Sequence, residues 1–257
     1  MVFSPSGFML DWVRQHGWVL PALEADDGKD RGLRGAAVFH NPLPTWIHRS
    51  TRIVKQKVEI LELVFFGRLE VKRGLSLFCD ALDRLSKEAD GLKRFSVSFF
   101  GQEADEAEFL LSGTKQKVFA REYIKERGKR WSFSWQMKAD EEVHTRLEWM
   151  GRDGRLAVMP ALIDNSPFAV KECMIAGIPF LASDIGGTRE LLHPEDRPRV
   201  LVETSPQALA RRLAEVLGEG MRPAEVDLAK EIESPDWVVW HHMAVEAVRK
   251  GIKRNSL

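Results

Sequence analysis

The residues most able to do chemistry in this sequence lie in a basic loop at positions 67–74. It holds three cations, Arg68, Lys72 and Arg73, in a chain whose 38 lysine and arginine residues balance 38 aspartate and glutamate residues. Guanidinium groups offer a planar fork of donors that suits phosphate oxygens. The loop has neither the glycine pattern of dinucleotide-binding loops nor that of P-loops. It therefore predicts a phosphate site of another kind, with a solvated basic turn as the alternative.

A second loop leads into a predicted helix that begins at Pro167. Asn165 or Ser166 can cap this helix, and proline suits its first turn. The start of a helix presents free backbone N–H groups and the positive end of the helix dipole. The pattern therefore predicts an anion site that needs no basic side chain.

Two carboxylates flank this helix start. Asp164 lies just before it, and Glu172 follows Phe168 by about one helical turn on the same face. Carboxylates accept hydrogen bonds, and the hydroxyl groups of a sugar and a ribose are donors. The pair thus favours a polyhydroxylated ligand, whereas the alternative is that Asp164 caps the helix and Glu172 pairs with a nearby lysine.

A third loop contains the glycine pair Gly186-Gly187. Glycines let a backbone approach a ligand closely, or simply form a tight turn between a strand and a helix. Of these two interpretations the tight turn is favoured.

The elements that must position these loops alternate along the chain. Continuous apolar runs such as 63–66 and 156–159 are typical of strands buried on both faces of a parallel sheet. Helical patterns separate the predicted strands, and they fall at 74–89, 103–111, 117–128, 140–150, 167–176 and 206–218. This order predicts an α/β fold with a doubly wound parallel sheet. Ligands bind beyond the carboxyl ends of such strands, so the three loops should share one edge.

Composition excludes several classes of protein. A formal net charge of zero gives no electrostatic case for a nucleic-acid partner. No apolar run approaches the ~20 residues of a spanning helix, and the first residues lack a signal-peptide pattern. Cys79 and Cys173 lie in apolar stretches without metal-ligand spacing, as expected in a reducing cytosol. We expect a soluble, cytoplasmic protein, for which peripheral docking onto a membrane stays compatible with the sequence.

Together the three loops resemble the motifs of a known family. Residues 67–74 match its G-R-L-x-x-x-K-G loop, Asp164 to Glu172 match its E-x7-E motif, and 186–190 match a G-G-x-x-E segment. The chain is similar, over residues 58–220, to family 4 of the retaining glycosyltransferases. These enzymes have the GT-B architecture of two Rossmann-like domains, of which this chain resembles the C-terminal, donor-binding one.

The resemblance implies roles for the site residues. Arg68 and the motif lysine would hold the diphosphate of a nucleoside-diphosphate sugar; Arg73 replaces that lysine, and the adjacent Lys72 could take its place. Glu172 would bind the ribose, and Asp164, one methylene shorter than the motif glutamate, would face the donor sugar as the catalytic residue. The rest of the donor site would comprise Gly67, Asn165, Ser166, Pro167 and the backbone N–H groups of Phe168, Ala169 and Val170. The family needs neither a metal nor a cofactor.

The resemblance also implies a domain organisation. Residues 1–57 would be a remnant of the acceptor domain plus the linker, which would begin near Asn41-Pro42, and residues 58–257 would form the donor domain. Such a piece of a longer hexosyltransferase of glycan biosynthesis would need its missing N-terminal domain. Alone, it would bind a sugar nucleotide such as a UDP-sugar but transfer poorly. Two alternatives are a GT-B epimerase and a non-catalytic binding or scaffold module with a decayed site. The base, the sugar and the acceptor stay open.

Overall fold

The computed structural model describes residues 2–20, 36–38, 56–88, 91–138, 143–152, 154–225 and residue 245. The chain divides into two compact units, one made of Met1–Pro42 with Asp227–Leu257 and the other of Leu43–Val226. The predicted linker start at 41–42 and the end of the chain after residue 245 lie outside the described residues. The predicted domain division between residues 57 and 58 stays a prediction.

The first unit contains a small strand–helix–strand motif. Strand β1 (Val2–Ser4) pairs in parallel with β2 (Ala36–Val38), and helix α1 (Gly7–Gln15) follows β1. Ser6 caps α1, because its side chain accepts the Met9 N–H at 3.3 Å. The residues Val2 to Ser6 predict the end of a strand followed by the start of a helix, and the structure confirms this order.

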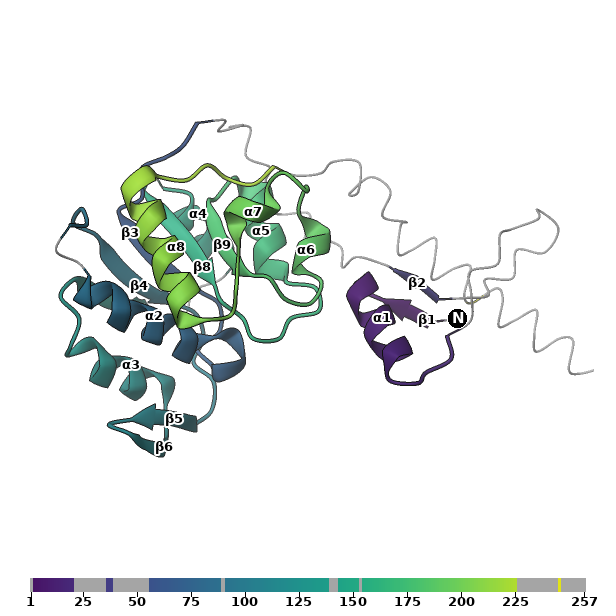
Figure 1. Ribbon diagram of the computed structural model, residues 1–257, viewed down its shortest axis with the longest axis horizontal. Coiled ribbons are helices and arrows are strands. Elements are labelled where there is room, and N and C mark those ends of the chain that lie inside the picture. Colours follow the sequence, from purple (N-terminus) through teal and green to yellow (C-terminus); the bar gives the residue numbers. More distant parts are fainter. Residues whose placement is uncertain are drawn as a thin grey trace, which may run out of the picture. The chain divides into compact units, whose positions relative to one another are not determined.

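The second unit is built on a six-stranded parallel sheet in the order β10-β9-β8-β3-β4-β7 (Figure 1). Its strands are β3 (Glu62–Phe66), β4 (Ser96–Phe100), β7 (Ser134–Lys138), β8 (Arg155–Met159), β9 (Phe180–Ser183) and β10 (Leu201–Val202). The doubly wound parallel sheet predicted from the alternation of strands and helices is therefore confirmed.

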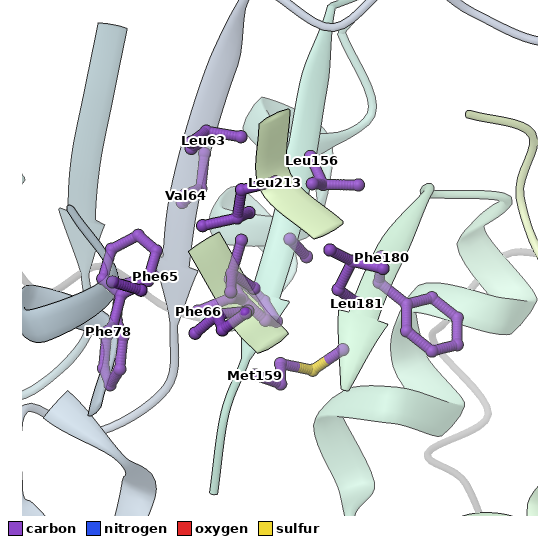
Figure 2. Close-up of a cluster of buried hydrophobic side chains, with 14 of the residues drawn as sticks. Leu63, Val64, Phe65, Phe66, Phe78, Leu156, Met159, Phe180, Leu181 and Leu213 are labelled. Carbon is purple, nitrogen blue, oxygen red and sulfur yellow. The ribbon is translucent and has the colours of Figure 1, made fainter. Parts of the chain in front are cut away.

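Strand β3 forms the middle of the core. Every residue of Leu63 to Phe66 is at most 5% exposed, which agrees with a strand covered on both faces. Figure 2 shows these side chains beside those of β8 and β9, with Leu213 of α8 (Pro206–Glu219) over the sheet. This burial fixes β3, and with it the start of the basic loop that follows.

Helices cover both faces of the sheet (Figure 1). The contacts of α2 with α3 and α8 place these three helices together, and α4 packs with α5. Right-handed crossovers put the first group on one face and the second on the other. Their bounds are α2 (Leu75–Lys87), α3 (Ala120–Gly128), α4 (Val143–Met150) and α5 (Phe168–Ala176), and the short helices α6 (Thr188–Leu191) and α7 (Arg197–Val200) follow.

The helix predicted at 103–111 is wrong. Strands β5 (Ala107–Leu111) and β6 (Thr114–Val118) form an antiparallel hairpin there. Phe109 and Leu111 are buried while Glu108 and Leu110 are exposed, so burial alternates with a period of two. Ser112 and Gly113 both have positive φ, at 50° and 80°, as the tight turn of a hairpin requires. The helix predicted to follow is present, but it begins at Ala120.

The apolar pattern of residues 199–203 predicts a last strand there, and the observed strand is shorter. Its first part belongs to α7, and β10 keeps only Leu201 and Val202, which pair with β9. Asp196, 1% exposed, accepts a hydrogen bond from Arg199 at 2.8 Å and stabilises this turn of helix. The local ion pair therefore stabilises a helical turn at residues that the apolar pattern alone assigns to a strand.

The sheet changes winding direction between β3 and β8. After β3 the chain adds β4 and β7 on one side, and then returns to add β8, β9 and β10 on the other. Loops that leave two such neighbouring strands run to opposite faces, and ligands of open α/β sheets bind where they part. The basic loop follows β3 and the Asp164 loop follows β8, so both lie at this switch point.

Candidate functional site

The basic loop needs glycine at both ends. Gly67 follows β3 with φ +151°, and a Cβ on Gly101, after β4, would lie 1.8 Å from the Gly67 carbonyl oxygen. Gly74 has φ +79°, and a Cβ there would lie 1.7 Å from the carbonyl oxygen of Pro160. The loop is thus packed backbone to backbone against the loops that follow β4 and β8.

The basic loop and the Asp164 loop are joined directly. The Leu162 N–H donates to the Lys72 carbonyl oxygen at 2.9 Å. The Arg73 guanidinium forms a hydrogen-bonded ion pair with the Asp164 carboxylate. Residues 91 positions apart in the sequence therefore meet at the switch point, as the predicted sheet required.

The glycine pair completes the junction. The Gly187 N–H donates to the Asp164 carbonyl oxygen at 3.4 Å. Gly186 has φ +53°, and a Cβ there would lie 1.7 Å from the same oxygen. The pair forms the tight turn favoured from the sequence, and its close approach is to Asp164. Three loops therefore converge on this one residue.

The start of α5 carries no side-chain cap. The helix begins at Phe168, after Pro167 in an extended conformation, so the predicted caps Asn165 and Ser166 are wrong. The reason is that Asp164 accepts the Ser166 N–H at 3.2 Å, which closes a turn before the helix begins. Ser166 is 8% exposed, and its hydroxyl has no hydrogen-bond partner among the described residues.

This helix start presents its first amides without competition from a side chain. They belong to Phe168, Ala169 and Val170, and the first bond within the helix is from the Lys171 N–H to the Pro167 carbonyl oxygen. Together with the Ser166 hydroxyl they form a set of donors at the positive end of a nine-residue helix. Such a set suits an anion.

The three cations of the basic loop differ in their partners. Arg68 is exposed, and within the described part of the chain its side chain has no hydrogen-bond or ion-pair partner. Lys72, 61% exposed, lies 3.6 Å from Glu70. Arg73 lies between the Asp164 carboxylate and Glu70, whose oxygen is 3.6 Å from its Nε.

Glu172 lies one turn into α5 and is partly buried. Burial raises the pKa of its carboxyl group above the usual value, and the positive charge of Arg146 on α4 partly opposes this shift. A carboxylate that loses water without gaining a full partner is suited to accept hydrogen bonds from a ligand. The lysine partner proposed as the alternative is replaced by an arginine on a different helix.

A family model described as "Glycosyl transferases group 1" matches residues 61–219, which is more than half of the chain. The chain belongs to this family. The match contains all three converging loops, and no curated protein matches the sequence.

Solved structures show that this chain has the Rossmann-like α/β fold of GT-B enzymes. Trehalose 6-phosphate synthase from Burkholderia multivorans is 18% identical with a TM-score of 0.57, over 98% of this chain and 60% of that one. Sucrose-phosphate synthase from Thermosynechococcus elongatus is 15% identical with a TM-score of 0.55, over 85% and 49%. HepE from Anabaena, whose structure contains UDP, is 15% identical with a TM-score of 0.51, over 85% and 54%. The chain thus spans roughly half the length of these proteins.

Two charged residues at this site were not predicted from the sequence. Glu70 contacts both Lys72 and Arg73, and its spacing of three residues from Arg73 was an available signal. The positive charge of Arg146 on α4 acts on Glu172, and no spacing could reveal this because it depends on how α4 packs against α5. Both residues change the charge that a ligand would meet.

The described residues lack two other kinds of feature. No helix among them combines the length and apolar composition needed to span a bilayer. No three or more of their histidine, cysteine, aspartate and glutamate side chains are grouped as metal ligands would be.

Proposed function

We propose that this chain binds a nucleoside-diphosphate sugar at the switch point and provides the donor side of a retaining, metal-independent glycosyl transfer of the family 4 type. The observation that carries the proposal is the convergence of three loops on Asp164, beside an uncapped helix start and Arg68, which has no partner among the described residues. The UDP in the structure of HepE supports it.

The diphosphate would lie against the start of α5. Its oxygens would accept hydrogen bonds from the amides of residues 168–170 and from the Ser166 hydroxyl, while Arg68 adds positive charge. Negative charge grows on the diphosphate as the bond to the sugar breaks. Fixed donors that are already in place stabilise that charge without reorganisation, and they do so without a metal ion.

Glu172 would bind the ribose. Two neighbouring ribose hydroxyls donate to one carboxylate, which compensates for the water that the carboxylate has lost. This role uses the ionised form, so ribose binding should weaken as the pH falls through the raised pKa of Glu172. The sequence position of Glu172, one turn beyond the proposed phosphate site, matches the offset between a diphosphate and its ribose.

Isothermal titration calorimetry of the whole chain with UDP, GDP, ADP and their glucose conjugates tests the proposal. We expect the nucleotides of one base to bind best. Arg68→Ala should weaken their binding about tenfold or more, which is the effect of losing one charge-assisted hydrogen bond. Glu172→Ala should weaken binding of the nucleoside diphosphate but not binding of inorganic pyrophosphate, because pyrophosphate has no ribose. Chelation of metal ions with EDTA should leave each affinity unchanged.

Arg94→Ala is the matched control, because Arg94 is exposed and precedes β4 at the opposite edge of the sheet. It removes the same charge and should leave binding unchanged. Absence of binding at millimolar ligand would refute the proposal and favour a non-catalytic module. An equal loss of affinity in Arg68→Ala and Arg94→Ala would show that only net charge matters.

A further inference from the structure

The proposed donor site contains three cations, but they are not equally available to a ligand. The guanidinium of Arg73 is hydrogen-bonded to Asp164, and Glu70 lies 3.6 Å from its Nε. Two carboxylates therefore compensate one positive charge. Lys72 is 61% exposed and approaches only Glu70, at 3.6 Å, without a hydrogen bond among the described residues.

The carboxylate of Asp164 is likewise already hydrogen-bonded within the protein. One of its carboxylate oxygens accepts the Ser166 N–H and the other accepts from Arg73, while its carbonyl oxygen accepts the Gly187 N–H. Its side chain is only 13% exposed. The three oxygens of this residue are thus used to hold the basic loop, its own loop and the glycine pair in place.

We infer that Arg73 and Asp164 form a clasp that positions the start of α5, and that Lys72, together with Arg68, is the side chain that meets the diphosphate. The inference rests on the proposed function and assigns roles within its site. It makes Asp164 a positioning residue, since its side chain acts on the helix start through Ser166 and on the basic loop through Arg73.

The two departures from the family motif agree with a clasp. Arginine stands where the motif has lysine, and aspartate stands where it has glutamate, and these are the two residues that contact each other. The longer, forked cation is matched by the shorter carboxylate, so the pair keeps its charge balance and its span. Loss of function at a decayed site would not be expected to compensate in this way.

A double-mutant cycle on ligand binding tests the clasp. Arg73→Gln leaves Asp164 without its cation, and Asp164→Asn leaves Arg73 with only Glu70 at 3.6 Å, and each should weaken UDP, GDP or ADP binding about fivefold. The double variant replaces the ion pair by two neutral amides that can still hydrogen-bond. It should recover an affinity within about threefold of the unchanged chain. Lys72→Ala should weaken binding about tenfold and lower its salt dependence.

The alternatives give different results. If Arg73 binds the diphosphate, the double variant binds no better than Arg73→Gln, and the inference is overturned. If Asp164 contacts the donor sugar, Asp164→Asn weakens binding of the sugar nucleotide more than binding of the nucleoside diphosphate, in the Arg73→Gln background as well. That result also overturns the inference. If the unchanged chain binds no nucleotide at all, the proposed function itself fails. Thermal unfolding of each variant shows whether it has folded.

Discussion

Gly186→Ala should damage the site by forcing two loops apart. At φ +53° an alanine carries a backbone cost of about 1–2 kcal/mol. Its Cβ would also lie 1.7 Å from the Asp164 carbonyl oxygen, half the 3.4 Å at which ordinary contact begins. Since that atom belongs to the backbone and cannot rotate away, overpacking adds about 1–3 kcal/mol. We expect the free energy of unfolding to fall by about 2–5 kcal/mol in total.

Gly113→Ala separates the two contributions. Gly113 has a similar φ of +80° but no atom within 4 Å of the added Cβ, so only the backbone cost of about 1–2 kcal/mol applies. Urea unfolding followed by tryptophan fluorescence measures both variants, and nucleotide titration should show a loss only for Gly186→Ala. Equal destabilisation by the two substitutions would refute the argument that the third loop is held by close approach to Asp164.

Three further predictions concern other parts of the second unit. Glu172→Gln should raise the free energy of unfolding at pH 7 by about 0.5–1 kcal/mol. Because burial raises the pKa of Glu172 in the folded state, the unchanged chain loses stability as the pH rises through that pKa. Urea unfolding should therefore show that the advantage of the glutamine variant shrinks toward pH 4.5. Burial likewise raises the pKa of Cys79 and Cys173, so a thiol reagent at pH 8 should label neither in the folded chain and both in urea. Asp196→Ala should cost about 3 kcal/mol in urea unfolding, because it leaves Arg199 without its carboxylate and the Glu225 N–H without its acceptor.

The sheet could be predicted from the sequence because its signal is strong and local. Four consecutive large apolar residues at 63–66 need cover on both faces, and only a central parallel strand provides it. The three loops followed from the same pattern, since the carboxyl ends of parallel strands share an edge. The ion pair between Arg73 and Asp164 then confirmed that the first two loops meet.

The hairpin at 107–118 could not be predicted with the same ease. Its outward-facing residues include Leu110, 59% exposed, which hides the alternation that marks a strand. Its inward side is defined by a partner elsewhere: Phe109 stacks on Tyr123 of α3 with ring centroids 4.3 Å apart. A short segment whose burial depends on another element carries little information of its own. The Ser112-Gly113 turn was the one local signal.

The partners of the site residues could not be predicted from the sequence for a different reason. Spacing placed Asp164 and Glu172 on either side of a helix start, but it could not decide which charge each one faces. Asp164 forms an ion pair with Arg73, and the charge of Arg146 acts on Glu172, and both relations arise from packing between elements. The motif therefore predicts which loops come together, but it does not predict which charges face each other within them.

The pairing of charges also determines what kind of force can hold a ligand here. Arg68, Lys72 and Arg73 supply three positive charges, and Glu70 and Asp164 cancel two of them. The start of α5 adds only about half a charge. The proposed ligand, a nucleoside diphosphate, carries more negative charge than this remainder, so the side chains would leave part of that charge unneutralised. In the proposal, the backbone amides at 168–170 and the Ser166 hydroxyl, which has no hydrogen-bond partner among the described residues, supply directed hydrogen bonds to the phosphates. A site of this kind would discriminate by the geometry of the phosphates, which gives a physical reason for fixing three loops closely around one residue.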